Sequence, residues 1–171
     1  NQRMLDKTDK SIAENYYNHL LKVCEYLREK GEDLIILNHE GIPDQKICER
    51  LSEDCDGVPV VSHWDPVYIK TVIGCCKLLV SSRFHGCVSA LSQGVPVIAT
   101  SWNHKYEMLL EEYGVGGSLI NLKSDEIDFE MIERALLPAT RDKIMIESQS
   151  LKLKTKQMWE EVFEFLSNHG I

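Results

Sequence analysis

Arg83 and His85 stand two residues apart in the run Ser82-Arg83-Phe84-His85-Gly86, and their side chains suit anion binding and proton transfer. A guanidinium forms paired hydrogen bonds with a carboxylate or phosphate, and an imidazole titrates near neutral pH. Ser82 is expected to cap the following helix, which places both side chains in a first turn whose free N–H groups favour an anion. Gly86 has no Cβ, so a ligand can approach the backbone closely there. The run predicts a ligand site; the alternative is a solvated turn whose arginine pairs with a helix carboxylate.

The elements around this turn alternate between short apolar runs and helical periodicity. Strands are expected at 34–37, 58–61, 78–81, 97–100 and 118–122, and the longer helices at 9–30, 45–53, 126–137 and about 140–168. The strands are continuously apolar, as is typical of strands that are covered on both faces. The pattern predicts an α/β fold with a three-layer, doubly wound, mainly parallel sheet of Rossmann-like type.

Four loops follow the carboxyl ends of these strands, where open parallel sheets bind their ligands. The loops are residues 39–40, 63–65, 83–85 and 102–105, and they hold four of the six histidines. We expect Asn103 or Lys105 to lie near Arg83 and His85 in one concave site, with Trp102 as a wall. In the second of these loops, Pro66 favours Asp65 as a helix cap over a catalytic base.

Charge and cysteine content exclude several classes of partner. The 171 residues carry a formal net charge of −8, which argues against a nucleic-acid backbone as ligand. The six cysteines show no paired metal-ligand spacing, so we expect free thiols, no metal and a reducing compartment. No signal peptide or membrane-spanning apolar run is recognisable in the sequence. These features predict a cytoplasmic setting, with no cofactor and no membrane span.

The sequence from Asp65 to Lys105 resembles the polysaccharide pyruvyl transferase family. The resemblance rests on the Ser82 to Gly86 run, on Gly94-Val95-Pro96-Val97-Ile98 and on the lysine that opens the next helix. It covers roughly residues 33–116 and implies a two-domain architecture like that of GT-B glycosyltransferases, of which this chain is similar to the C-terminal, donor-binding half. The implied reaction transfers pyruvate from phosphoenolpyruvate to a sugar of a surface polysaccharide or exopolysaccharide, as a ketal.

The resemblance also implies roles for individual residues. Arg83, with Ser82 and Gly86 beside it, would hold the carboxylate or phosphate of phosphoenolpyruvate, and Lys105 would add a second positive charge. His85 would be the general acid that protonates the methylene carbon of the donor.

Other interpretations stay open at this point. His39 and Asp44 loosely match a further histidine and acid of the family, or they belong to a capped loop with a surface histidine, in which Asp44 caps the helix at 45–53. A GT-B-like glycosyltransferase half would bind a nucleotide sugar at the same loops, but the Glu-x7-Glu arrangement typical of many such donor sites is missing, since Cys48 stands eight residues after Glu40. A non-catalytic domain that binds an anionic metabolite is the third possibility.

The chain begins with Asn1 instead of methionine. Together with the resemblance, this predicts that residues 1–171 are a single α/β domain from the C-terminal part of a longer protein. The glycan acceptor would then bind a missing N-terminal domain, and this piece alone would be inactive.

Residues 140–169 are expected to form a C-terminal helical segment with an apolar stripe. The stripe would either cross to the missing domain or pack on this domain's own core, and if uncovered it would favour a homodimer. Its members are Leu151, Met158, Trp159, Val162, Phe163 and Leu166.

Overall fold

The computed structural model describes residues 1–100 and 103–169, so the expected role of Trp102 lies outside the described residues. In chain order the elements are α1 (Gln2–Asp6), α2 (Lys10–Glu29), β1 (Ile36–Asn38), α3 (Ile42–Asp54), β2 (Val60–Ser62), α4 (Pro66–Gly74), β3 (Leu79–Ser81), α5 (Phe84–Leu91), β4 (Val97–Ala99), α6 (His104–Glu112), α7 (Phe129–Leu136) and α8 (Pro138–Asn168). The mixed α/β class is therefore confirmed, and only the short helix α1 was not predicted.

Helix boundaries follow local chemistry in most places. Asp65 caps α4 by accepting a hydrogen bond from the backbone N–H of Val67 at 2.8 Å, and Pro66 occupies the first turn. Gly31 and Gly94 have positive φ angles of 77° and 76°, as the chain reversals after α2 and α5 require. These caps and reversals were readable from the sequence.

Two predicted helix starts are wrong. Asp44 does not cap α3: the helix begins earlier, at Ile42, because Pro43 fits the first turn, and Asp44 lies inside that turn. Ser82 does not cap α5 either, because the N-cap residue is Arg83. The backbone N–H of Arg83 donates to the hydroxyl of Ser81 at 3.0 Å, which holds the turn before α5, and the Arg83 side chain makes no capping bond.

The strands form two parallel pairs. β1 pairs with β2 with Asn38 opposite Ser62, and β3 pairs with β4 with Ser81 opposite Ala99. The expected fifth strand is reduced to one parallel bridge between Ala99 and Leu119. The parallel direction is confirmed, whereas these pairings do not confirm one continuous three-layer sheet.

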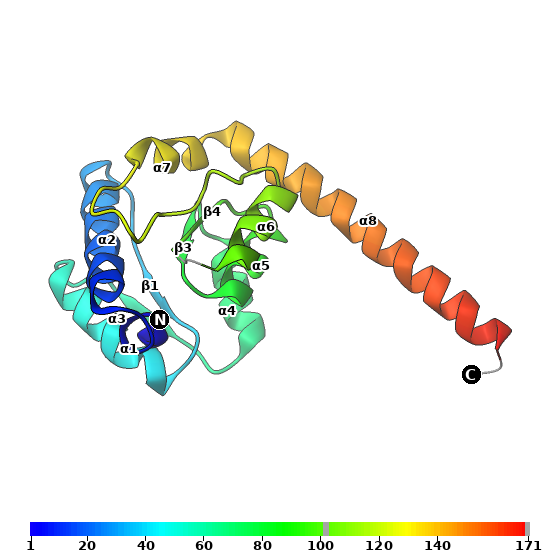
Figure 1. The fold of residues 1–171 in the computed structure, drawn as a ribbon, viewed down its shortest axis with the longest axis horizontal. Coiled ribbons are helices and arrows are strands. Elements are labelled where there is room, and N and C mark those ends of the chain that lie inside the picture. Colours follow the sequence, from blue (N-terminus) through cyan, green and yellow to red (C-terminus); the bar gives the residue numbers. More distant parts are fainter. Residues whose placement is uncertain (101–102, 170–171) are drawn as a thin grey trace.

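Side chains along the strands alternate between two apolar clusters. Ile98 of β4 packs with α2, α3 and α7, whereas its neighbours Val97 and Ala99 pack with α4, α5 and α6. The segment near the bridge behaves in the same way, with Ile120 in the first cluster and Leu119 in the second. Because successive strand residues point to opposite faces, the strands lie between two groups of helices (Figure 1).

Helix α8 begins on the domain and then leaves it (Figure 1). Ile144 and Ser148 are buried, and the Ser148 hydroxyl donates to the carbonyl of Ser92 at 3.0 Å. Leu151 still packs on the second cluster, but Met158 and Trp159 are 48% and 52% exposed. The alternative in which the whole stripe packs on the domain's own core is therefore wrong. Within the described ranges, no helix combines the length and apolar character needed to cross a membrane.

Candidate functional site

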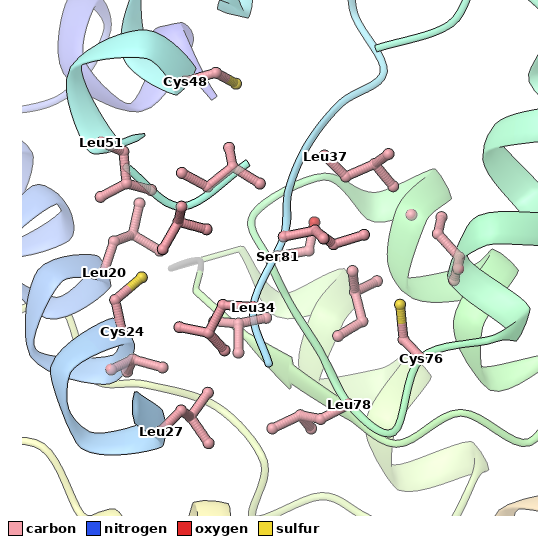
Figure 2. A pocket seen from close by; sticks show the side chains of 18 of the residues that line it. Leu20, Cys24, Leu27, Leu34, Leu37, Cys48, Leu51, Cys76, Leu78 and Ser81 are labelled. Atoms are coloured by element: carbon pink, nitrogen blue, oxygen red, sulfur yellow. The ribbon is translucent and has the colours of Figure 1, made fainter. Parts of the chain in front are cut away.

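A cavity of about 640 Å³ is lined largely by segments 31–37 and 75–83, which contain most of β1 and all of β3. Figure 2 shows its apolar part, into which Leu20 and Leu27 of α2 and Leu51 of α3 project. Its polar end follows the carboxyl ends of the two strands, where His39, Asp44, Ser82, Arg83 and Gly86 contribute to the wall. Mostly apolar pockets of this size with a few convergent polar groups commonly bind small molecules.

Arg83 is the cation at the polar end of the cavity, and a carboxylate holds it. Its Nη2 and Nε donate to Oδ2 of Asp44 at 2.6 and 3.1 Å. Glu40 is a weaker second partner, with Oε2 3.4 Å from Nη1 and a side chain that is 43% exposed. The guanidinium is thus oriented across the cavity mouth, from the β3–α5 turn towards the β1–α3 loop.

Asp44 is buried in this site and is ionised. Its side chain is 7% exposed, and Oδ1 also accepts the backbone N–H of Gln2 at 2.8 Å. Burial by itself would raise the pKa of Asp44, but the hydrogen bonds from Gln2 and Arg83 outweigh it and lower the pKa below its ordinary value. The carboxylate therefore keeps its charge and fixes Arg83.

Ser82 is held in place by the hydroxyl groups of two tyrosines. Its hydroxyl lies 3.1 Å from the hydroxyl of Tyr16, and its carbonyl accepts from the hydroxyl of Tyr106 at 2.7 Å. Burial raises the pKa of Tyr16 to about 12, so this phenol stays protonated. Two distant helices, α2 and α6, thus clamp the residue that precedes Arg83.

His39 lies beside Gly86 at the polar end of the cavity. A Cβ at position 86 would lie 3.7 Å from Nε2 of His39, which is an ordinary contact distance. The imidazole is half-buried, and burial lowers its pKa, so it is neutral at pH 7. His39 can therefore donate one hydrogen bond and accept another at the polar end of the cavity.

His85, Asn103 and Lys105 are exposed and do not contribute to the cavity wall. His85 stands on the first turn of α5, and the side chain of Asn103 caps α6 by accepting from the N–H of Lys105 at 3.1 Å. The Lys105 ammonium lies 4.7 Å from the centre of the Phe84 ring, a cation–π contact that brings it towards the β3–α5 turn. Four of the predicted site residues thus line the cavity, namely His39, Ser82, Arg83 and Gly86. The other three, His85, Asn103 and Lys105, lie outside it.

Sequence reasoning missed the two tyrosines that hold Ser82, whereas Asp44, which holds Arg83, was a candidate. Tyr106 lies at helical spacing before Leu109, Leu110 and Tyr113, so its inward direction was available from periodicity. The residues around Tyr16 in the sequence do not indicate its contact with Ser82, which lies 66 positions further along the chain. Within residues 1–100 and 103–169, no group of three or more His, Cys, Asp or Glu side chains is arranged to hold a metal ion.

A sequence model of the polysaccharide pyruvyl transferase family matches residues 2–104. The matched segment is more than half of the chain and contains His39, Asp44, Ser82, Arg83 and Gly86 of the cavity's polar end. The chain therefore belongs to the polysaccharide pyruvyl transferase family. No curated protein and no solved structure matches the chain.

Proposed function

We propose that this chain binds phosphoenolpyruvate and supplies the donor-binding half of a pyruvyl transfer site. The pyruvyl group would pass to a sugar of a polysaccharide as a ketal, with release of phosphate. One observation carries this proposal: Arg83, in the segment that matches the family, points its guanidinium across the polar mouth of a ligand-sized cavity. The acceptor would be held by a domain outside these 171 residues.

The first step is exchange of an anion on Arg83. Asp44 already neutralises the guanidinium, so an anionic donor has to replace a partner. Glu40 is the replaceable one, because it is 3.4 Å away and 43% exposed, and exposed ion pairs of this kind contribute about 0–1 kcal/mol. One anionic group of the donor would occupy Nη1 of Arg83 while Asp44 keeps the guanidinium oriented.

Lys105 would supply a second positive charge. Phosphoenolpyruvate carries a carboxylate and a phosphate. A single arginine that is already paired with Asp44 would leave most of the negative charge of this donor uncompensated. The ammonium of Lys105 is exposed and lies over Phe84, the residue after Arg83. It could therefore move to the donor without breaking an ion pair described for it in residues 1–100 and 103–169.

His85 would act as the general acid. In ketal formation the methylene carbon of the donor takes up a proton, two sugar hydroxyls bond to the adjacent carbon in turn, and the bond to the phosphate oxygen breaks. Of the two hydroxyl protons, one returns to the general acid and the other leaves with the phosphate. An imidazole on the first turn of α5 is one residue from the Phe84 ring and two from Arg83, and it is open to an incoming substrate. Positioned general acids of this kind contribute about 10²–10⁴-fold to the rate.

We also propose that β1 and β3 are neighbours in a doubly wound, three-layer sheet with strand order β2-β1-β3-β4, as in the C-terminal half of a GT-B fold. Both strands are parallel to their partners, and the residues that follow them, His39 and Ser82, contribute to the polar end of the same cavity. The alternation of strand side chains between two helical groups also supports this arrangement. Such a sheet would bring the loops after β1 and β3 to one edge.

The proposal is tested by measuring ligand binding to residues 1–171 through thermal unfolding and calorimetry. Phosphoenolpyruvate should raise the melting temperature, whereas inorganic phosphate should do so only at much higher concentration and nucleotide sugars should not. Arg83→Ala should abolish the shift. Glu40→Gln should strengthen binding, because it removes the competing carboxylate.

Contrary results would point to a different ligand. Stabilisation by nucleotide sugars alone would favour a glycosyltransferase donor domain, and stabilisation by phosphate as strong as that by phosphoenolpyruvate would favour a non-catalytic anion-binding domain. In an active protein that includes an acceptor domain, Arg83→Ala should weaken donor affinity and His85→Ala should lower turnover. Unchanged kinetics for both variants would remove these residues from the mechanism.

A further inference from the structure

The loop between β2 and α4 exposes a cluster of three aromatic side chains. Trp64 is 89% exposed, and Tyr68, on the first turn of α4, is 46% exposed. The ring of His63 stacks on both, with its centre 5.6 Å from the centre of Trp64 and 4.2 Å from that of Tyr68. Tryptophan is highly buried on average, and exposed apolar clusters usually mark an interaction site. These three rings are therefore a candidate binding surface.

The loop holds this aromatic cluster in one geometry. Asp65 caps α4 by accepting from the N–H of Val67, and Pro66 occupies the first turn of the helix. The backbone N–H of Asp65 also donates to Nδ1 of His63 at 3.0 Å, which fixes the imidazole ring. Side chains that are already oriented lose little freedom when a ligand binds, so the surface is formed before the ligand arrives.

The aromatic cluster lies at the same end of the strands as the candidate site. β1 and β2 are parallel neighbours, with Asn38 opposite Ser62. The next residues, His39 and His63, therefore leave adjacent strands at the same end. Because His39 belongs to the polar end of the cavity, the cluster follows the strand next to the one that carries this part of the cavity wall.

The faces and edges of these rings together match the chemistry of a sugar. One face of a pyranose ring carries C–H groups that pack on an aromatic ring, while its hydroxyls need hydrogen-bond partners. In neutral His63 the proton is on Nε2, because Nδ1 accepts from Asp65. The indole N–H of Trp64 and the hydroxyl of Tyr68 are further donors. Among the residues that the structure describes, none of these three groups donates to another protein atom.

The charge of this segment favours an uncharged ligand. No lysine or arginine stands between Arg50 and Lys70 in the sequence. A nucleobase could also stack on a tryptophan, but this segment offers no cation to the phosphate of a nucleotide. A neutral sugar needs only the ring face and the donors at its edge.

We propose that Trp64, His63 and Tyr68 form a sugar-binding platform for one pyranose unit of the glycan acceptor. The inference rests on the proposed function, which supplies the glycan. One face of the sugar ring stacks on the indole of Trp64, and its hydroxyls accept from Nε2 of His63 and the hydroxyl of Tyr68. The donor-binding half thus contributes to acceptor recognition, and the domain outside these 171 residues holds the rest of the glycan.

The test is NMR spectroscopy of ¹⁵N-labelled residues 1–171 with methyl β-galactoside and methyl β-glucoside, each up to about 100 mM. The chain has three tryptophans, so Trp64→Phe identifies the indole N–H signal of Trp64. At least one glycoside should shift this signal, with a dissociation constant of about 1–50 mM. Saturation transfer from the protein should be strongest to the C–H groups of the stacked face.

Matched variants locate the binding. Trp64→Ala should raise the dissociation constant about tenfold or more, measured by saturation transfer, whereas Trp64→Phe keeps a ring face and should raise it less. Trp159→Ala removes another half-exposed tryptophan, on α8, and should leave the constant unchanged. Circular dichroism checks that each variant keeps its fold. Glycerol, a polyol without a ring face, should not shift the Trp64 signal.

Several results would overturn the platform. These are an unshifted Trp64 signal with both glycosides, equal losses for Trp64→Ala and Trp159→Ala, an equal shift with glycerol, and a larger shift with uridine monophosphate than with either glycoside. Phosphoenolpyruvate binding is measured in parallel by thermal unfolding. Glycoside contacts at Trp64 without stabilisation by phosphoenolpyruvate would support the platform and contradict the proposed donor. Stabilisation by phosphoenolpyruvate without glycoside contacts would overturn the platform alone.

Discussion

Replacing Asp44 by asparagine is the most direct test of how the candidate site is built. The change keeps the size of the side chain and removes the charge that holds Arg83 through bonds of 2.6 and 3.1 Å. The guanidinium, 17% exposed, would be left with only the distant carboxylate of Glu40. The structure therefore predicts a loss of stability that is much larger than a surface substitution causes.

The magnitude follows from the burial of the two partners. Breaking a fully buried ion pair costs about 3–5 kcal/mol, and a hydrogen bond to a charged group contributes about 1.5–3 kcal/mol. Since water still reaches part of Arg83, we expect Asp44→Asn to lower the free energy of unfolding by about 2–3 kcal/mol. For a chain of this length, that corresponds to a fall in melting temperature of about 4–12 °C.

The assay is urea unfolding at pH 7, followed by circular dichroism. Glu40→Gln serves as the matched control, because its more exposed ion pair is worth at most about 1 kcal/mol. Combining Asp44→Asn with Arg83→Met should cost less than the sum of the two single changes, since both remove the same interaction. Equal losses for Asp44→Asn and Glu40→Gln, or strict additivity with Arg83→Met, would refute the argument.

The pH dependence of the same variant gives a second check. The pKa of Asp44 is lower in the folded chain than its ordinary value of 3.8, so the unfolded chain binds more protons on this group. Its contribution to stability is therefore complete above that ordinary value and is lost as the pH falls through the folded pKa. The difference between wild type and Asp44→Asn should shrink below about pH 4.

Two further predictions concern the rest of the domain. Gly94→Ala should lower the free energy of unfolding by about 1–2 kcal/mol for the left-handed backbone alone, and more if Met145 cannot move, because the new Cβ would lie 2.1 Å from Sδ of Met145. Thermal unfolding of Gly94→Ala with and without Met145→Ala separates the two effects, and an unchanged melting temperature in Gly94→Ala would contradict both. Burial lowers the pKa of His19 and His39, so the folded chain binds fewer protons and should lose stability as the pH falls below about 6.5. His19→Leu should reduce that loss between pH 7.5 and 5.5 in urea unfolding; a pH dependence identical to wild type would be the opposing result.

Much of the fold could be predicted because its causes are local. Apolar periodicity indicated α2, α7 and α8, Asp65 with Pro66 indicated the start of α4, and continuous apolar runs indicated β1 to β4 to within two residues. The wrong helix starts at Asp44 and Ser82 have a shared cause: the N-cap residues, Gly41 and Arg83, make no side-chain capping bond, so residue type did not mark where these helices begin.

The candidate site could be predicted only in part. The sequence alone determined that Arg83 and His85 stand at a strand-to-helix turn, because residue type and periodicity are properties of the local chain. Only the tertiary structure decided that Asp44, from the first turn of α3, orients Arg83, that Tyr16 and Tyr106 clamp Ser82, and that α8 leaves the domain. Such contacts join residues far apart in the chain, and which of them form depends on how whole helices and strands pack, which no local pattern specifies.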